Sequence, residues 1–404
     1  MKILFIADVS LENPTSGSEQ VLYQQATGLA KDGMEVFAIT RREAPSPRII
    51  RNISGVREGS YSASALNLLR SLFPVARYPA DFYRQFTQDS PFQVAVCQQP
   101  LNCLSLLIMR KLGHVPFLYV FHSPSHQEYI LSHPKGNRFR VFLNANFRRM
   151  IEKFCLRKAM KIIVLSRYMQ KKVKEVHGID TKRIEINPGG VDLNRFRPPG
   201  DRKLLKHKLG LPEGRIHLLT IRNLEPRMGI ENLLKSMLIL KKSPDEIHLI
   251  LGGEGIEMQN LKRLIRGYGL LNDVTMAGFI PPEILSEYYG AADFFILPTR
   301  NLEGFGLVTP ESMACGTPVL GTPVGGTKEI LSGFDPRFLF RDTSPRAMAE
   351  GIRWAIVEYF VKREKYNQLR IDCRAYAEKN YSWRRHIDQL KWMLDNEMRL
   401  LSIN

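Results

Sequence analysis

Short apolar runs alternate with segments of helical periodicity along most of this 404-residue chain, and this alternation restricts the fold more than any other feature. In the first half, the runs that predict buried strands are Lys2–Ala7, Glu35–Thr40, Gln93–Cys97, Phe117–Phe121, Lys161–Leu165 and Arg183–Ile186. Continuous apolar strands separated by helices are typical of a parallel sheet that is covered on both faces. We therefore expect a doubly wound α/β domain over residues 1–190.

The same alternation begins again after a stretch rich in proline and glycine, within which we assign residues 191–200 as a linker. The strands predicted beyond it are His217–Ile221, His248–Leu251, Val274–Ala277, Phe294–Leu297 and Val319–Gly321. They predict a second doubly wound domain over residues 201–380. Residues 381–404 form an amphipathic helix that we expect to pack on the first domain. Two such domains place a ligand cleft between the carboxyl ends of their sheets.

The chain is strongly basic, with 58 Lys and Arg against 40 Asp and Glu and a net charge of +18. The surplus lies mainly in the first half, most densely from His133 to Arg183, and attracts polyanions or an anionic membrane surface. The alternative is a generally basic, solvated surface. No helix-turn-helix, zinc-finger, RRM or KH pattern occurs, so we do not expect nucleic-acid binding. The 5 cysteines show no metal-binding spacing, so we expect reduced thiols and no structural zinc.

The sequence also bears on where the protein resides. The first residues, MKILFIADVSLENP, contain an apolar run that is too short for a signal peptide. No stretch approaches the roughly 18 apolar residues that a membrane-spanning helix needs. We therefore expect a cytoplasmic protein.

The segment Pro298–Glu311 carries the clearest chemical signal. It follows a predicted buried strand, contains the run EGFGLVTPE and leads into a helix that we expect to open near Val308. The amides of Phe305, Gly306 and Leu307 then lie before the positive end of the helix dipole. Unpaired N–H groups at such a position favour an anion, so the turn predicts a phosphate site.

Two carboxylates, those of Glu303 and Glu311, flank this predicted phosphate site. Because a carboxylate repels a phosphate, both fit better as acceptors for sugar hydroxyls on either side of it. The alternative is an ordinary strand-to-helix turn, in which one glutamate caps the helix and the other is solvated.

The spacing of Glu303 and Glu311 resembles the E-x7-E motif of the retaining GT-B glycosyltransferases of the family 4 type. The following segment, Ser312–Gly326 (SMACGTPVLGTPVGG), resembles the E-A-x-A-x-G-x-P-V-V-A-T-x-x-G-G run of that family. Asn187–Phe196 (NPGGVDLNRF) resembles its N-G-V-D-x-x-x-F linker. The resemblance continues to the YSW at 381–383 and covers nearly the whole chain, and several motifs in the right order are specific. It implies two Rossmann-like domains that face a cleft.

The resemblance implies donor-binding roles for residues of the second domain. Glu311 corresponds to the residue that binds the nucleotide ribose, and Glu303 corresponds to the one that binds hydroxyls of the donor sugar. The distal phosphate would be held by the amides of Phe305, Gly306 and Leu307. The segment whose backbone reads the edge of the base corresponds to Gly278, Phe279 and Ile280.

Two positions in the first domain also match the family. Ser16–Glu19 (SGSE) resembles its G-G-A-E loop, in which Gly17 would let the backbone approach the phosphates of the donor. His122 lies just past a predicted strand, as does the family histidine that contacts the donor sugar. A structural histidine at a strand end is the alternative.

The sequence departs from the family where the diphosphate is bound. The family supplies an arginine and a lysine from G-R-x-x-x-x-K-G, whereas this chain has Asn223 and Met228 at those positions. Arg222 and Arg227 each lie one residue earlier. We expect these two arginines to take over the diphosphate contacts, because an uncompensated diphosphate would be costly to bury. A degenerate, non-catalytic subunit is the alternative.

The resemblance implies a hexosyltransferase that moves a sugar from a UDP- or GDP-linked donor to an acceptor hydroxyl with retention. Catalysis would rest on amides and arginines aimed at the charge that grows on the leaving diphosphate. No metal or other cofactor is expected, since the chain has no acidic pair of the DxD type on a plausible metal loop.

The acceptor is indicated less directly. Leu, Phe and Tyr mix with arginines in Ser64–Phe86, and Arg138–Lys174 is densely basic. These segments favour a protein that lies peripherally on the inner face of a membrane and acts on a glycan or a lipid-linked acceptor of a cell-surface polysaccharide or glycolipid pathway. A solvated basic helix face is the alternative there. For the function as a whole, a nucleotide-sugar epimerase on the same fold is the second hypothesis.

Overall fold

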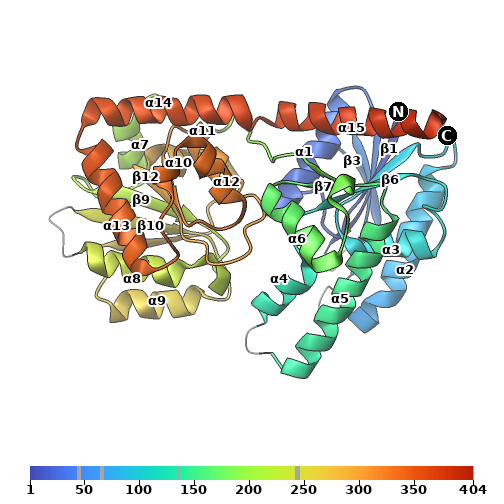
Figure 1. Ribbon diagram of the computed structural model, residues 1–404, viewed down its shortest axis with the longest axis horizontal. Coiled ribbons are helices and arrows are strands. Elements are labelled where there is room, and N and C mark those ends of the chain that lie inside the picture. The colour runs from blue at the N-terminus through green and yellow to red at the C-terminus, as the bar shows by residue number, and fades with distance from the viewer. Residues whose placement is uncertain (43–46, 64–67, 134–135, 242–245, 404) are drawn as a thin grey trace. The chain divides into compact units, whose positions relative to one another are not determined.

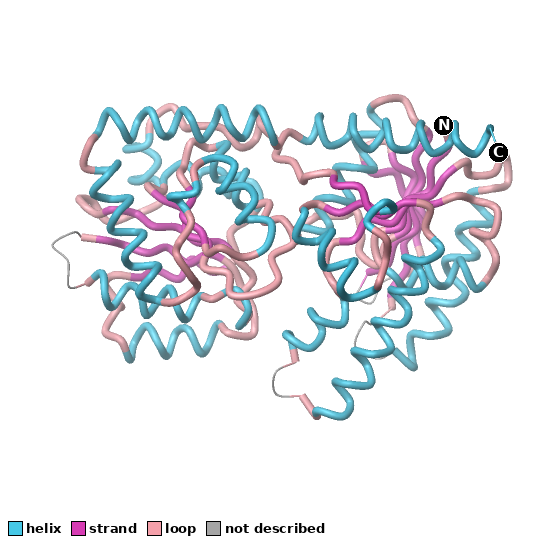
Figure 2. Tube along the Cα trace, in the orientation of Figure 1, coloured by secondary structure: helices cyan, strands magenta, loops and turns pink. Residues whose placement is uncertain are grey.

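The computed structural model describes residues 1–42, 47–63, 68–133, 136–241 and 246–403. The chain forms two units, one of Met1–Pro188 together with Trp383–Asn404 and one of Gly189–Ser382. Each unit has a central sheet with helices on both faces (Figure 2). The predicted fold class, two doubly wound domains, is confirmed.

The first unit contains an eight-stranded sheet in the order β3-β4-β2-β1-β5-β6-β7-β8. Its strands are β1 (Lys2–Ile6), β2 (Glu35–Arg42), β3 (Ile49–Ile53), β4 (Val56–Ser62), β5 (Val94–Cys97), β6 (Phe117–Phe121), β7 (Lys161–Val164) and β8 (Ile184–Ile186). Its helices are α1 (Gly17–Lys31), α2 (Leu68–Phe86), α3 (Pro100–Ile108), α4 (Ser125–Ser132), α5 (Arg138–Lys158), α6 (Arg167–His177), the short 3-10 helix Thr181–Arg183, and α15 (Trp383–Ile403). The central strand β1 is fully buried and pairs in parallel with β2 and β5, which places the core at the middle of the sheet.

The hairpin of β3 and β4 was not predicted, and β3 departs from the expected all-parallel sheet. It runs antiparallel to β4, and the two strands are joined at Ser54 and Gly55, which both have positive φ angles (49° and 90°). Polar residues interrupt the apolar ones in this segment (IIRNISGVREGSYS), so it lacks the continuous apolar run of a central strand. Within it, Glu58 is fully buried and accepts hydrogen bonds from Thr40 Oγ1 at 2.7 Å and Arg51 Nε at 2.7 Å.

The C-terminal helix α15 lies beside α1 in the first unit (Figure 1). A Cβ atom added at Gly28 of α1 would lie 2.1 Å from Ile387 Cδ1, so the two helices approach closely there. Arg384 forms an ion pair with Asp32 at 2.7 Å, and this contact lowers the pKa of Asp32. The last segment of the chain therefore completes the first unit.

The second unit contains a five-stranded parallel sheet in the order β11-β10-β9-β12-β13. Its strands are β9 (Ile216–Ile221), β10 (Ile247–Gly252), β11 (Val274–Gly278), β12 (Phe294–Leu297) and β13 (Val319–Gly321). Its helices are α7 (Arg202–Lys208), the 3-10 turn Pro226–Met228, α8 (Ile230–Leu240), α9 (Met258–Gly267), α10 (Pro282–Ala291), α11 (Val308–Ala314), α12 (Gly325–Phe334), the 3-10 turn Pro336–Phe338, α13 (Pro345–Ala355), the π-helical Ile356–Phe360 and α14 (Arg363–Asn380). The loops after β9 and β12 leave the carboxyl edge of this sheet, where open α/β folds bind ligands.

The five cysteines of the chain are all buried and carry free thiols. In the described ranges, no helix combines the length and the apolar character that crossing a bilayer requires.

Candidate functional site

The loop between β12 and α11 is held by close backbone approaches that only glycine permits. Gly306 has a φ of 84°, and a Cβ there would lie 2.7 Å from Thr327 Oγ1. Gly325 has a φ of 62°, and its Cβ would lie 2.0 Å from the carbonyl oxygen of Glu303. The amide of Gly326 donates to that same carbonyl at 3.0 Å. The glycines thus fix the backbone of the EGFG run against the start of α12.

The carboxylate of Glu303 is ion-paired with the guanidinium of Arg222, which follows β9. The side chains are 7% and 9% exposed for Arg222 and Glu303, respectively, so water screens the pair little. Thr299 Oγ1 donates a second hydrogen bond to Glu303 Oε2 at 3.2 Å. Two of the predicted site residues, from distant parts of the sequence, therefore meet at the carboxyl edge of the second sheet.

Arg227 lies against the same loop. Its Nη1 donates to the carbonyl oxygen of Leu302 at 3.0 Å, and its Nε pairs with Glu225 at 2.8 Å. The backbone carbonyl of Arg227 in turn accepts the amide of Arg300 at 2.8 Å. Leu302 has an unusual positive φ of 56°. The segment that carries Arg227 is therefore fastened to the segment that carries Glu303.

The residues at the family's arginine and lysine positions lie differently. Asn223 is exposed, and Met228 is buried against Arg222, whose guanidinium contacts its sulfur. Gly229 follows with a φ of 75°, and a Cβ there would lie 1.9 Å from the carbonyl oxygen of Pro298. The backbone register at Gly229 is thus fixed by this close approach.

The predicted phosphate-binding amides precede α11 as expected from the sequence. Within the described ranges, the amides of Phe305, Gly306 and Leu307 donate no hydrogen bond to another backbone group. Beside Gly306, the hydroxyls of Thr309 and Thr327 are buried and have no partner among the residues described. These two threonines were not predicted as site residues, because a threonine at a helix start commonly has a local capping role.

Glu311 lies in α11, and its Oε2 accepts a hydrogen bond from the hydroxyl of Tyr289 at 3.0 Å. Burial raises the pKa of Glu311, although the Tyr289 hydroxyl and the charge of Arg195 act in the opposite direction. Tyr289 is fully buried in α10, so it fixes one carboxylate oxygen of Glu311. Tyr289 was not predicted as a site residue, because a tyrosine in an apolar helix gives no signal of its partner.

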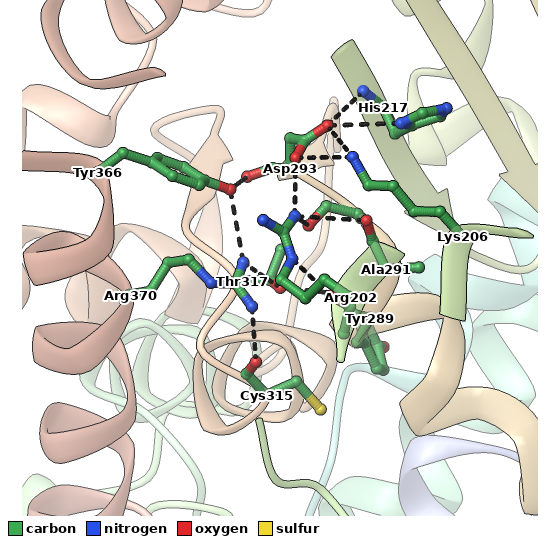
Figure 3. A network of polar contacts seen from close by, with 12 residues as sticks. Arg202, Lys206, His217, Tyr289, Ala291, Asp293, Cys315, Thr317, Tyr366 and Arg370 are labelled. Atoms are coloured by element: carbon green, nitrogen blue, oxygen red, sulfur yellow. Dashed lines mark hydrogen bonds and ion pairs between the residues drawn. The ribbon is translucent and has the colours of Figure 1, made fainter. Parts of the chain in front are cut away.

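A buried polar network supports the backbone at Tyr289 (Figure 3). Thr317 Oγ1 donates to the carbonyl oxygen of Tyr289 at 2.7 Å. Asp293 lies at the centre of the network and accepts from Arg202 at 2.7 Å and Lys206 at 2.9 Å. Burial alone would raise the pKa of Asp293, but its contacts with His217, Arg202 and Lys206 lower it. Asp293 therefore remains ionised, and the network fixes the backbone of the segment that carries Tyr289.

The segment predicted to read the base lies at the end of β11. Gly278 has a φ of 67°, and its carbonyl oxygen accepts the amide of Gly253. Phe279 is 51% exposed, whereas Ile280 is buried. The aromatic ring of Phe279 thus projects from the edge of the sheet, and Ile280 packs in the core.

Two predicted site residues belong to the first unit. Gly17 is the first residue of α1, and the preceding Ser16 caps this helix together with Glu19. Glu19 accepts the amide of Ser16 at 2.8 Å, so its side chain serves the cap. His122 follows β6, and its Nε2 lies 2.8 Å from Gln98 Oε1. Burial lowers the pKa of His122 to about 4, so it is neutral at physiological pH.

In the described ranges, no group of three or more His, Cys, Asp or Glu side chains has an arrangement that could hold a metal ion.

The second half of the chain, residues 201–379, matches the family model described as glycosyl transferases group 1. Residues 15–195 match the model described as glycosyltransferase family 4. Among curated proteins, the D-inositol 3-phosphate glycosyltransferase of Geodermatophilus obscurus is 33% identical over 226 residues, which are 53% of this chain and 47% of that protein. The mannosylfructose-phosphate synthase of Agrobacterium fabrum is 30% identical over 218 residues, covering 52% and 47%. The chain thus spans about half the length of the curated relatives it matches.

Solved structures share the fold over the whole chain. Sucrose-phosphate synthase from Thermosynechococcus elongatus has a TM-score of 0.81 at 21% identity and covers 100% of both chains. Anabaena HepE in complex with UDP-glucose has a TM-score of 0.74 at 19% identity and covers 98% of this chain and 100% of its own. The family models, which together match most of the sequence, and this shared GT-B fold identify the chain as a member of the group 1 and family 4 glycosyltransferases.

Proposed function

We propose that this protein transfers a hexosyl unit from a nucleoside diphosphate sugar to an acceptor hydroxyl, with retention of the anomeric configuration. The observation that carries the proposal is the meeting of Arg222 with Glu303 on a loop that also leads to Glu311. One carboxylate on each side of the turn formed by Phe305, Gly306 and Leu307 suits a ligand that has sugars at both ends of a diphosphate. Solved structures of Anabaena HepE, which has a similar fold, contain UDP and UDP-glucose, and this supports a nucleotide-sugar donor.

In this proposal the second unit binds the donor. Glu311, whose second oxygen is held by Tyr289, accepts hydrogen bonds from the ribose hydroxyls. Glu303 accepts from hydroxyls of the donor sugar. The distal phosphate is bound by the amides of Phe305, Gly306 and Leu307, with the hydroxyls of Thr309 and Thr327 beside Gly306 as further donors. The base lies along the backbone of Gly278, Phe279 and Ile280.

The chemical step breaks the bond between the anomeric carbon and the diphosphate oxygen, and the electron pair stays on that oxygen. The acceptor oxygen forms the new bond to the anomeric carbon, and its proton is released. Because negative charge grows on the diphosphate, the guanidinium groups of Arg222 and Arg227 stabilise the transition state more than the ground state. No metal is needed in this scheme, since arginines and amides meet the charge.

The proposal also gives roles toward the donor to two residues of the first unit. His122 accepts a hydrogen bond from the donor sugar, and the backbone at Gly17 approaches the phosphates. Both roles rest on the resemblance of FHSPSHQEY and SGSE to the family's segments.

The test is turnover and donor binding with UDP-, GDP- and ADP-linked sugars. Hydrolysis or transfer of the sugar from one of them, without epimerisation of the donor, would support the proposal. Conversion of the donor alone into an epimer would favour the alternative of an epimerase. If none of them binds, the alternative of a degenerate, non-catalytic subunit is favoured. Asn223 and Met228, which stand at the family's arginine and lysine positions, are the reason for considering that alternative.

For the acceptor, we propose a lipid-linked or glycan substrate at an anionic membrane surface, which the protein approaches peripherally from the cytoplasm. The support is an exposed apolar face on α5. Six large apolar side chains lie on this one face of the helix and are exposed. Four of them are more than half exposed, namely Phe139 (69%), Phe142 (63%), Leu143 (51%) and Met150 (69%). The others are Phe147 and Phe154.

Arginines and lysines accompany this apolar face of α5. Arg138, Arg140, Arg149, Arg157 and Lys158 are exposed on the same helix. An amphipathic helix with apolar and cationic side chains inserts shallowly into an anionic bilayer, because the bilayer buries its apolar area and the anionic lipids attract its positive charge. The other segment named for this role, Ser64–Phe86, lies partly outside the described residues, and its Arg77 and Arg84 pair with Asp81.

A further inference from the structure

A chain of buried hydrogen bonds runs through the first unit from the backbone of Pro188 to the imidazole of His122. The carbonyl oxygen of Pro188 lies 2.7 Å from His386 Nδ1, and His386 Nε2 lies 2.9 Å from Gln25 Nε2. Gln25 Oε1 lies 2.7 Å from Gln98 Nε2, and Gln98 Oε1 lies 2.8 Å from His122 Nε2. These side chains come from α15, α1, the end of β5 and the end of β6, and Gln25, Gln98 and His386 are buried.

The first bond fixes the direction of all the others. A carbonyl oxygen only accepts, so His386 Nδ1 must carry the proton that it donates to Pro188. Burial lowers the pKa of His386 to about 4, so this ring is neutral at physiological pH and its Nε2 is an acceptor. Gln25 must therefore donate through its amide nitrogen and present its oxygen to Gln98. Gln98 then presents its own oxygen to His122.

The opposite direction is excluded by the same contacts. If the amide of Gln98 turned round, its oxygen would face the oxygen of Gln25, unless Gln25 turned as well. A turned Gln25 would present an oxygen to His386 Nε2, which carries no proton. A buried acceptor that faces another acceptor loses its hydrogen bond and its solvation together.

We infer that Gln98, Gln25 and His386 are positioning residues that hold His122 as the Nε2–H tautomer and leave its Nδ1 as the unprotonated ring nitrogen. This inference rests on the proposed function for its consequence, since His122 can then accept a hydrogen bond from a donor-sugar hydroxyl through Nδ1. His386, whose bond to Pro188 fixes the direction of the other bonds, is 264 positions from His122 in the sequence. It lies close to both places where the chain passes between the units, Pro188 and Trp383.

The decisive measurement is the protonation of each imidazole nitrogen of His122, read by NMR in protein with 15N-labelled histidine. The signals of His122 are assigned by their loss in His122→Gln. At pH 7 the ligand-free protein is expected to show protonated Nε2 and unprotonated Nδ1. A protonated Nδ1, or an equal mixture of the tautomers, would overturn the inference without any reference to activity.

The chain of hydrogen bonds from Pro188 through His386, Gln25 and Gln98 to His122 is called the relay. It is tested by His386→Leu, with Gln389→Leu as the matched control. Gln389 lies one turn further along α15 and also donates to a backbone carbonyl, that of Ile186 at 2.9 Å, which is not among the bonds that link Pro188 to His122. His386→Leu should release the amides and produce both tautomers of His122, whereas Gln389→Leu should leave the Nε2–H form. An unchanged His122 in the first variant, or the same change in both, would refute the relay.

A conservative substitution separates positioning from simple packing. In Gln98→Glu the carboxylate still accepts from His122 Nε2, so the tautomer should persist while the pKa of His122 rises toward neutrality. In Gln98→Leu the tautomer should be lost, and kcat/KM for the donor should fall about tenfold, as expected for one neutral hydrogen bond. Identical tautomers in the two variants would contradict the inference. If the tautomer is as expected but no nucleotide sugar is turned over, the proposed function fails and the tautomer assignment stands.

Discussion

Arg222 and Glu303 form an ion pair that is almost completely buried, although their side chains come from loops 81 residues apart in sequence. The pair joins a residue proposed to stabilise the diphosphate to a residue proposed to bind the donor sugar. A nearly buried pair is costly to break on one side, because the remaining charge is left uncompensated. The same pairing keeps the carboxylate of Glu303 compatible with a neighbouring phosphate.

The first prediction concerns the stability of this pair. Arg222→Leu should lower the free energy of unfolding by about 3–5 kcal/mol, because Glu303 would remain charged and buried. Adding Glu303→Leu should restore most of that loss, and urea unfolding of the two variants measures both effects. As a control, Arg346→Leu removes an exposed pair with Glu350 and should cost less than about 1 kcal/mol. Equal losses in the single and double variants would show that the pair does not matter.

The second prediction concerns the arginine that replaces the family's lysine. Arg227→Met should lower kcat by about 100-fold while the KM for the donor changes much less, because the guanidinium acts on charge that grows in the transition state. Steady-state kinetics with the preferred nucleotide sugar measure the two constants separately.

The register of this loop can be tested in the same assay. In the background Arg222→Ala, Arg227→Ala, the substitutions Asn223→Arg and Met228→Lys should recover part of the activity if only the position along the loop has moved. Full activity without either arginine would show that neither one reaches the diphosphate. Added chelator should leave the wild-type rate unchanged, because the proposed site relies on arginines and amides.

The third prediction concerns membrane binding by α5. The protein should sediment with vesicles that contain anionic lipid, and less so as salt rises, because screening acts over about 8–10 Å. Phe142→Ser together with Met150→Ser should weaken this binding by removing exposed apolar area. Val361→Ser alters an equally exposed apolar residue of the second unit and should have no effect. Equal recovery with neutral and anionic vesicles at low salt would refute the proposal.

The fourth prediction concerns the pH dependence of stability. Burial lowers the pKa of His122 and of His386 to about 4, so the folded protein binds fewer protons than the unfolded chain between about pH 6.5 and 4. Stability should therefore fall as the pH falls through that range, by up to about 3 kcal/mol for each histidine. Urea unfolding at several pH values measures this slope. His386→Gln should have a shallower slope, and an identical slope would contradict the assignment.

Much of this fold was predictable because buried parallel strands have a simple sequence signature. Phe117–Phe121 and Phe294–Leu297 are continuous apolar runs, and the structure has strands with those same bounds. The hairpin of β3 and β4 lacks such a run, so no local pattern marked it. Its buried Glu58 is stabilised by partners that are distant in sequence, which a pattern along the chain does not reveal.

The candidate site was predictable to a similar degree and for a similar reason. Glycines such as Gly306 and the spacing of Glu303 and Glu311 are local features, so the sequence contains them. The partners of these residues are not local. Tyr289 gave no signal of its contact with Glu311, and the pairing of Arg222 with Glu303 depends on how two loops meet at the edge of the sheet.

The central claim is that Glu311 holds the ribose of a nucleoside diphosphate sugar, and calorimetric titration of the preferred donor into wild-type protein and Glu311→Ala tests it most directly. Tyr289→Phe serves as the matched variant, since it removes only the hydrogen bond that orients Glu311 and should weaken binding less. The wild type is expected to give a saturable binding heat, and Glu311→Ala is expected to lose about 2–4 kcal/mol of binding free energy with the fold intact. Near-native donor affinity in Glu311→Ala would contradict it.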